Sequence, residues 1–283
     1  CVLNPELGHE YEGPVTEAEV KKNIVIVGAG PGGLEAAIYA AKRGHKVTVF
    51  EKEDHNGGQF YFASIPPGKG EITDFLVWQT TQCKKLGVEI RYNTEATMEN
   101  IKELDPDHVI LATGAVNKRP GIPGLRNDSR VVDPGDILTG KVWYGNQIVI
   151  IGGALVGSET AHFLSQELRD VSIVEMRAEI SQDAVFPVKV DINRHLDERK
   201  VKKYVNTTVK EIVEAGVVIE DNEGNQKTLP CDQIVVAVGR DPYKPLEGGL
   251  KDAGIEYSVI GDANGNKEAA DAIREAFELC RNI

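Results

Sequence analysis

The sequence has 283 residues, enough for two medium-sized domains, and its 41% hydrophobic and 27% charged residues are typical of a globular protein rather than a disordered one. A net charge of −12 without any basic run argues against nucleic acid as a partner. No apolar run reaches the ~18 residues that cross a bilayer, and no signal peptide opens the chain, so we expect a cytoplasmic protein that does not bind membranes.

The chain starts at Cys1 without a methionine, and we therefore expect a processed protein or a piece of a longer one. The other cysteines, Cys83, Cys231 and Cys280, lie far apart along the sequence. No pair has the CxxC spacing of a redox disulfide or of half a zinc site. We interpret these three as small apolar residues or bystanders, which leaves Cys1 as the cysteine with a candidate role.

A short apolar run at residues 23–27 leads into the turn GAGPGG, and an alanine-rich helix pattern and a second strand pattern follow it. Gly28 allows the tight turn, Gly30 lets the backbone approach a pyrophosphate, and Gly33 lets the helix pack on the strand. The helix N-terminus attracts the same anion, and Glu51 ends the second strand, where it can accept hydrogen bonds from an adenosine ribose. We predict a nucleotide site here, with a purely structural turn as the alternative. The predicted nucleotide-binding residues of this first copy are Gly28, Ala29, Gly30, Gly32, Gly33, Glu51 and Lys52.

A second copy begins at IGGALVGSE, where the middle glycine of GxGxxG is replaced by Ala154. Glu51 and Glu175 each follow the first glycine of their turn by 23 positions, which predicts two similar βαβ domains. The methyl group of Ala154 should weaken nucleotide binding without abolishing it; the alternative is a copy that kept its fold and lost its ligand. The predicted nucleotide-binding residues of this copy are Gly152, Ala154, Leu155, Val156, Gly157, Glu175, Val238 and Gly239.

The stretch 118–126 is rich in proline and glycine and is predicted to cross from the first domain to the second. Near the C-terminus, a short strand pattern precedes Gly261 and Asp262, and an amphipathic helix follows over residues 269–280. One strand and one helix cannot form a third domain, so we expect them to complete one of the first two.

Together these motifs resemble the flavoproteins with two dinucleotide-binding domains. The resemblance implies an α/β fold of two Rossmann-like three-layer domains, the second inserted into the first. It implies a linker at 1–20, an FAD domain at 21–117 and 240–283, and an NAD(P)H domain at 118–239. Besides the turn residues, the resemblance implies that Asp262 binds the ribityl chain of FAD, that Gly58 and Gln59 lie beside the flavin, and that the backbone of Ala96 meets the adenine. The other residues that it implies in FAD binding are Ala112, Thr113, Gly114 and Gly261.

The opening residues CVLNPELGHE resemble a junction in the Old yellow enzyme-type NADH:flavin oxidoreductases, which include 2,4-dienoyl-CoA reductase, enoate reductases and trimethylamine dehydrogenase. In those enzymes a CxxNP segment supplies the last cysteine ligand of a 4Fe–4S cluster next to an FMN-bearing barrel. The resemblance implies that the chain is the C-terminal part of such a protein, that an N-terminal barrel with FMN is missing, and that Cys1 is a cluster ligand only in the longer protein. An unremarkable terminal cysteine is the alternative.

The resemblance implies an NAD(P)H-dependent flavin oxidoreductase that passes a hydride from the nicotinamide to FAD, a step that requires no catalytic acid, base or nucleophile from the protein. Glu175 favours NADH over NADPH because its carboxylate repels a 2′-phosphate, while NADPH stays open as the alternative because Arg177, two residues on, could accommodate that phosphate. In the longer protein, electrons would continue through the cluster and FMN to an activated alkene such as an enoate or enoyl thioester. Two alternatives stay open: an ADP-binding structural or electron-transfer module of an amine dehydrogenase-like protein, and a free-standing flavoprotein reductase. The partners are small-molecule dinucleotides, and the sequence leaves open whether the chain forms a homo-oligomer.

Overall fold

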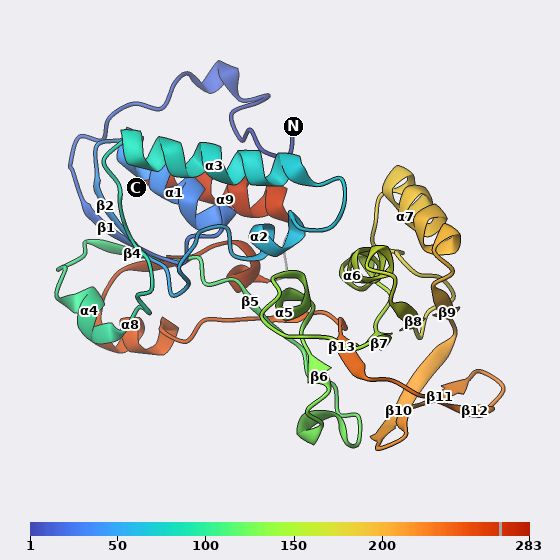
Figure 1. The fold of residues 1–283 in the computed structure, drawn as a ribbon. Coiled ribbons are helices and arrows are strands. Elements are labelled where there is room, and N and C mark those ends of the chain that lie inside the picture. The colour runs from blue at the N-terminus through green and yellow to red at the C-terminus, as the bar shows by residue number, and fades with distance from the viewer. Residues whose placement is uncertain (266–267) are drawn as a thin grey trace. The chain divides into compact units, whose positions relative to one another are not determined.

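The computed structural model describes residues 1–265 and 268–283, which form two compact units (Figure 1). Unit 1 comprises Cys1–Ser64, Lys69–Val116 and Asp241–Ile283, and unit 2 comprises Ile65–Gly68 and Asn117–Arg240. Unit 2 is therefore inserted into the sequence of unit 1. The two joining segments, β5 (Ala115–Asn117) and β14 (Arg240–Pro242), form a two-stranded sheet.

Unit 1 is built on a parallel sheet of five strands in the order β15-β4-β1-β2-β3. These strands are β1 (Asn23–Val27), β2 (Lys46–Phe50), β3 (Glu89–Arg91), β4 (His108–Leu111) and β15 (Tyr257–Val259). The helices are α1 (Pro31–Lys42), α2 (Gln59–Ala63), α3 (Gly70–Lys85), α4 (Met98–Lys102), α8 (Glu247–Ala253) and α9 (Ala269–Asn282), with short 3-10 turns η1 (Glu10–Glu12) and η3 (Gly261–Asn264).

The sheet of unit 1 is buried on both faces, which explains the nearly continuous apolar sequence of its strands. Ile24 and Ile26 pack in the cluster that contains α1 and α9, whereas Val25 and Val27 pack in the cluster that contains residues of α4 and α8. Figure 1 shows the longer helices above this sheet and α4 and α8 below it. Unit 1 thus has the three layers that the sequence predicts.

The C-terminal strand and helix, which were expected to complete one of the two domains, complete unit 1. β15 pairs in parallel with β4, and α9 packs against α1, where the rings of Tyr39 and Phe277 meet edge to face at 4.8 Å. Ala276 and Cys280 are fully buried on the same side of α9.

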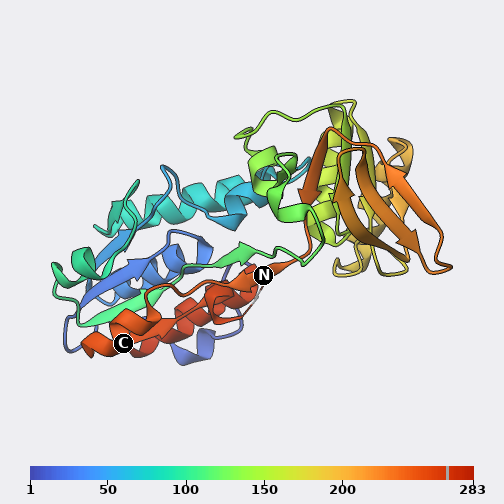
Figure 2. The same ribbon diagram turned by 90° about the horizontal axis from the view of Figure 1, so that it is seen from below.

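Unit 2 repeats the parallel sheet in the order β6-β13-β7-β8-β9 but carries a different third layer. Its parallel strands are β6 (Val131–Val132), β7 (Gln147–Ile151), β8 (Asp170–Val174), β9 (Lys202–Tyr204) and β13 (Gln233–Val236). One face packs on α5 (Pro134–Leu138), α6 (Leu155–Gln166) and α7 (Phe186–Glu198), and the other on the antiparallel strands β10 (Thr207–Val213), β11 (Gly216–Asp221) and β12 (Gln226–Leu229), which Figure 2 shows in orange.

The proline- and glycine-rich stretch 118–126, predicted as the crossing and as the start of the second domain, lies at the start of the Asn117–Arg240 segment of unit 2. Leu125 is buried against the face of unit 2 that carries the antiparallel strands, and the Ile212 N–H donates to the Pro123 carbonyl at 2.9 Å. The stretch is therefore packed rather than a free linker, and it ends in the 3-10 turn η2 (Leu125–Asn127). The crossing itself is the extended ribbon of β5 and β14.

The first twenty residues lie on unit 1, where side chains hold them in place. The Tyr39 hydroxyl donates to Glu6 at 2.8 Å, Arg281 pairs with Glu12, and the Ala18 N–H donates to the Arg43 carbonyl. Cys1 is exposed, whereas Cys83, Cys231 and Cys280 are buried, which fits small apolar residues better than bystanders.

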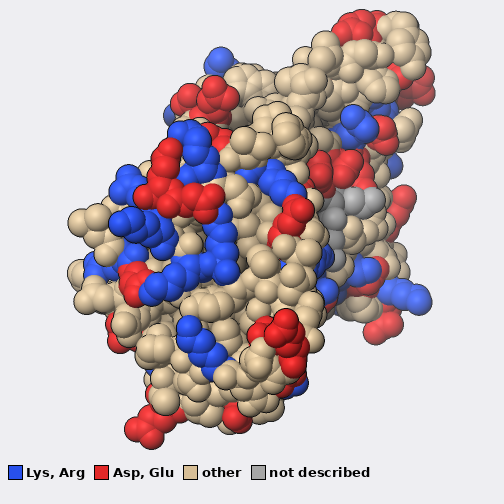
Figure 3. Space-filling model, turned by 90° about the vertical axis from the view of Figure 1, so that its right-hand side faces the viewer, with Lys and Arg blue, Asp and Glu red and all other residues tan. Residues whose placement is uncertain are grey.

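On the face shown in Figure 3, basic and acidic side chains both occur, and Lys and Arg side chains gather toward the left of the view. Within the described residues, no helix is long and apolar enough to cross a membrane. Over the same residues, no group of three or more His, Cys, Asp or Glu side chains is placed to hold a metal ion.

Candidate functional site

Two glycines of the turn in unit 1 are required by the protein itself. Gly28 has φ +104°, and a Cβ on it would lie 2.4 Å from the Ala112 carbonyl oxygen. A Cβ on Gly33 would lie 2.0 Å from the Gly28 carbonyl oxygen. Both distances are shorter than any real contact, so these glycines fix the tight turn and the seat of α1 on β1, as predicted.

Gly30 differs because nothing in the protein demands a glycine there. Its φ of −71° and ψ of 177° suit any residue, and a Cβ on it would meet no atom of the described residues within 4 Å. Gly30 is also the N-cap of α1, without a side-chain cap, so the first N–H groups of the helix lack that partner. The missing side chain and the helix N-terminus together fit an anion such as a pyrophosphate that approaches from outside the protein.

Glu51 ties the turn to the end of β2. It is buried, its Oε2 accepts the Ala29 N–H at 2.8 Å, and its Oε1 accepts the Glu53 N–H at 3.0 Å. Two carboxylate oxygens have about four acceptor positions, so capacity remains for ribose hydroxyls. The ribose contact is a prediction from the sequence, whereas this structural role of Glu51 was not predicted. The neighbouring Lys52 is exposed.

Loops that are distant in sequence meet beside this turn. The Gly57 N–H donates to the Ala29 carbonyl at 2.8 Å, and the Gln59 amide donates to the Asp262 carboxylate at 2.6 Å across 203 positions. A Cβ on Gly58 would lie 3.5 Å from the Gly30 Cα. The structure thus brings the turn, the GGQ loop and the Gly-Asp motif of η3 to one place.

The other predicted residues of unit 1 have more varied positions. Gly32 packs inside the fold, where its added Cβ would lie 3.3 Å from the Ala272 side chain of α9. The Thr113 hydroxyl and the Gly114 carbonyl both bond to the Tyr243 backbone. Ala96 is partly buried against the cluster below the sheet, two residues beyond Thr94, whose N–H donates to the Glu51 carbonyl. Gly261 donates its N–H to Glu275.

A buried polar pair supports the start of α1 from behind. The Gln79 amide of α3 donates to the Glu35 carboxylate at 2.6 Å and to the Pro31 carbonyl at 3.0 Å, and both side chains are fully buried. Burial raises the pKa of Glu35 to about 7. The pair therefore links α3 to the helix end that faces the candidate anion site.

The turn in unit 2 has the same backbone form. Gly152 has φ +100°, and a Cβ on Gly157 would lie 2.0 Å from the Gly152 carbonyl oxygen. Ala154 has φ −63° and ψ 178°, nearly the values of Gly30. Alanine therefore fits at position 154 without backbone strain, and its methyl group occupies the space that is left empty at Gly30 of unit 1.

Glu175 in unit 2 repeats the role of Glu51. It is buried, and its two oxygens accept the Gly153 N–H at 2.6 Å and the Arg177 N–H at 2.9 Å. Val238 lies beside the turn, with its Cγ1 3.3 Å from a Cβ built on Gly152, and Gly239 is exposed.

At the start of α6, the structure adds a residue that the sequence analysis missed. The Leu155 N–H donates to the Asp183 carboxylate at 2.8 Å, while the Val156 side chain is exposed. A carboxylate thus lies at the helix end where the pyrophosphate is predicted to bind.

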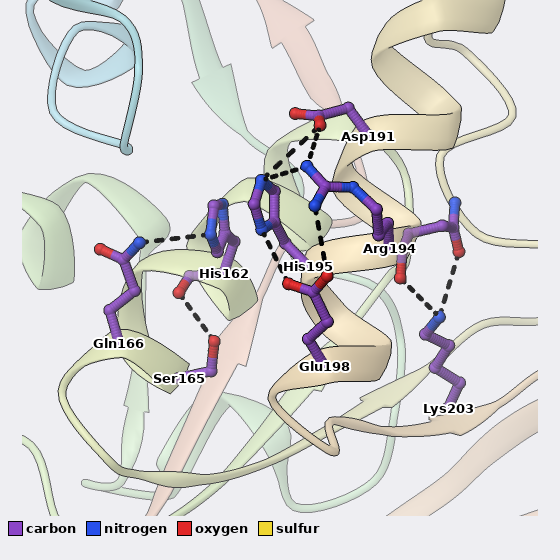
Figure 4. A network of polar contacts seen from close by, with 9 residues as sticks. His162, Ser165, Gln166, Asp191, Arg194, His195, Glu198 and Lys203 are labelled. Atoms are coloured by element: carbon purple, nitrogen blue, oxygen red, sulfur yellow. Dashed lines mark hydrogen bonds and ion pairs between the residues drawn. The ribbon is translucent and has the colours of Figure 1, made fainter.

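A polar network joins α6 to α7 in unit 2 (Figure 4). The rings of His162 and His195 stack at 4.7 Å, and Asp191, Arg194 and Glu198 surround His195. Burial lowers the pKa of His162, and the neighbouring His195 lowers it further, so the folded state favours the neutral ring. The ring stacking links α7 to the C-terminal half of α6, and the glycine turn lies at the N-terminus of α6.

Comparison with known proteins places the chain among oxidoreductases. The family model described as pyridine nucleotide-disulphide oxidoreductase matches residues 22–266. The chain is 38% identical over 288 residues to an NADH oxidase of Thermoanaerobacter brockii and 38% identical over 286 residues to a bilirubin reductase of Mediterraneibacter gnavus, in each case over the whole chain and 44% of the relative. A solved complex of 2-naphthoyl-CoA reductase with 2-naphthoyl-CoA matches with a TM-score of 0.95 and 33% identity, covering 100% of this chain and 43% of that one. The chain thus spans less than half the length of these proteins.

Proposed function

Because the chain belongs to the pyridine nucleotide-disulphide oxidoreductase family, which binds FAD and NAD(P)H, we propose that unit 1 holds FAD and that unit 2 binds NAD(P)H. When bound, the nicotinamide supplies a hydride and the flavin accepts it, so the chain's own residues position the two groups and tune their surroundings. The expected absence of a catalytic acid, base or nucleophile stays a prediction.

The observation that carries this assignment is the contrast between Gly30 and Ala154. The two positions share one backbone conformation, but unit 1 is open there and unit 2 carries a methyl group. A pyrophosphate can approach the open turn more closely, which suits a cofactor that stays bound. The more crowded turn suits a co-substrate that binds, reacts and leaves.

The residues of unit 1 would divide the binding of FAD between them. The N–H groups at the start of α1 would bind the pyrophosphate, Glu51 the adenosine ribose, and Asp262 the ribityl hydroxyls, with Gln59 orienting Asp262 through their hydrogen bond. The remaining proposed cofactor-binding residues of unit 1 are those named from the sequence, with Gly32 contributing through helix packing.

In unit 2, Glu175 would bind the ribose of the nicotinamide cofactor and favour NADH. Its carboxylate is buried, and both of its oxygens are held by backbone N–H groups, so it cannot easily turn away from a 2′-phosphate. Rapid-mixing reduction of the flavin by each cofactor tests this preference. Saturation at a lower NADPH than NADH concentration would reverse it.

For the whole protein we propose a longer reductase of the Old yellow enzyme type, with this chain as its C-terminal part. The CxxNP opening and the relatives of about twice this length support that proposal. An FMN-bearing barrel and a 4Fe–4S cluster with Cys1 among its ligands would then carry electrons to an activated alkene, and the named substrate of 2-naphthoyl-CoA reductase favours a thioester. A cytoplasmic location stays a prediction, and whether the chain forms a homo-oligomer stays open.

Release of the bound nucleotide by denaturation, followed by chromatography, tests the assignment of unit 1. FAD in the supernatant supports the reductase. ADP alone would instead support the binding module of an amine dehydrogenase-like protein.

A further inference from the structure

The duplication of the two units extends beyond the glycine turn to the loop that docks on it. Gly57 and Ser181 each follow the first glycine of their turn by 29 positions. Each donates its N–H to the residue after that glycine, Gly57 to the Ala29 carbonyl at 2.8 Å and Ser181 to the Gly153 carbonyl at 2.6 Å. Residues 181–183 of unit 2, here called the docked loop, therefore correspond to the GGQ loop of unit 1.

Ser181 fixes the docked loop firmly in place. It is fully buried and has φ +54°, a left-handed conformation that is uncommon for serine. Its hydroxyl bonds to the Ser158 hydroxyl at 2.8 Å, and Ser158 in turn donates to the Gly153 carbonyl at 3.0 Å. Because these contacts hold both the loop and the turn, the position of the next residues relative to α6 is set.

The consequence of this docking is that Asp183 reaches the first N–H of α6. Its Oδ1 accepts from Leu155 at 2.8 Å, and its side chain is otherwise exposed. The described residues of unit 1 make no equivalent contact, because Pro31 opens α1 without an N–H and the corresponding loop residue is the neutral Gln59, which bonds to Asp262. The carboxylate at the start of α6 in unit 2 therefore takes the place of the proline and the glutamine that unit 1 has at the equivalent positions.

We propose that Asp183 sets the affinity of unit 2 for its dinucleotide by holding the Leu155 N–H that the pyrophosphate of NAD(P)H would otherwise bind. This inference rests on the proposed function, in which unit 2 binds NAD(P)H. The carboxylate competes for the same donor and repels the anion, so binding requires Asp183 to release Leu155. Together with the methyl group of Ala154, this keeps the co-substrate weakly held and readily exchanged.

The test is the dissociation constant for NADH, measured by anaerobic calorimetry on the flavin-loaded chain and on Asp183→Asn, with the flavin reduced beforehand so that it accepts no hydride from NADH. We expect NADH to bind Asp183→Asn about tenfold more tightly at low salt, which corresponds to about 1.4 kcal/mol. The ratio should shrink at about 1 M salt, where the Debye length is only ~3 Å. Asp183→Ala removes both charge and acceptor and should also tighten binding, and it serves if the asparagine variant is poorly folded.

Glu167→Gln provides the matched control because it removes the same charge from the exposed far end of α6. It should leave the dissociation constant within about twofold of the unmodified chain. Unchanged or weaker NADH binding in both Asp183 variants would overturn the inference, as would equal tightening by Glu167→Gln. An unmodified chain that binds no NADH would overturn the proposed function of unit 2, and the inference with it.

Discussion

Replacing Gly30 with valine should empty the FAD site of unit 1 while unit 1 stays folded. The backbone at Gly30 is already extended, and an added Cβ would meet no atom within 4 Å in the part of the chain that the structure describes, so the fold tolerates a side chain there. Valine adds three carbon atoms on the side from which the pyrophosphate would approach. At about 1–2 kcal/mol for each poorly accommodated carbon, the loss is about 3–6 kcal/mol, or two to four decades in affinity.

Gly33→Ala is the informative comparison because it adds fewer atoms and should do more damage to the fold. Its Cβ would lie 2.0 Å from the Gly28 carbonyl oxygen, so α1 must move, at a cost of about 3 kcal/mol or more. The assay is flavin content on purification together with the thermal unfolding midpoint of each variant. The reasoning is refuted if Gly30→Val keeps full flavin, or if Gly30→Val lowers the unfolding midpoint of the apoprotein as much as Gly33→Ala does.

Three further predictions concern unit 2 and the buried ionisable groups. Ala154→Gly should tighten NADH binding by about tenfold, or 1–2 kcal/mol, with flavin content unchanged; equal titrations would mean that the pyrophosphate does not pass over this residue. Glu35→Gln should stabilise the chain at pH 8 by up to about 3 kcal/mol and much less at pH 5. The reason is that Glu35 has a pKa of about 7 in the folded chain and 4.5 in the unfolded chain, so its ionisation destabilises the fold as pH rises. A difference between the two proteins in the free energy of urea unfolding that does not change with pH would contradict this. His162→Phe should reduce the loss of stability below about pH 6.5, because the pKa of His162 is lower in the folded than in the unfolded chain, so the unfolded chain takes up the proton first as pH falls. The pKa values of His45 and His108 are also lowered, so part of the pH dependence of stability should remain. An unchanged profile of urea midpoints from pH 5.5 to 7.5 would count against a contribution from His162.

The sequence was informative wherever a local rule determines the structure. The turns at Gly28 and Gly152 need positive φ, and the buried parallel strands need continuous apolar residues, so both could be predicted from short stretches. The equal spacing to Glu51 and Glu175 predicted a duplication. In the structure, each carboxylate accepts N–H groups from equivalent positions, namely the residue after the first glycine of its turn and the residue two positions after the glutamate.

Long-range contacts were beyond the reach of those rules. The bond between Gln59 and Asp262 joins residues 203 positions apart, and no local pattern specifies it. Asp183 was missed because the docked loop of unit 2 contains no glycine and resembles GGQ only in its spacing and backbone hydrogen bond. The antiparallel layer β10-β11-β12 was not predicted either, because apolar and polar residues do not alternate regularly in the β10 sequence TTVKEIV, and its pairing with β11 shifts register between Val209 and Glu211.

The most direct test of the central claim is an anaerobic titration of the purified chain with NADH while the visible flavin absorbance is recorded. We expect a yellow protein whose absorbance falls in proportion to the NADH added until the flavin is consumed, because both cofactor sites are proposed to lie within this chain. A colourless protein, or a flavin whose absorbance NADH leaves unchanged, would contradict it.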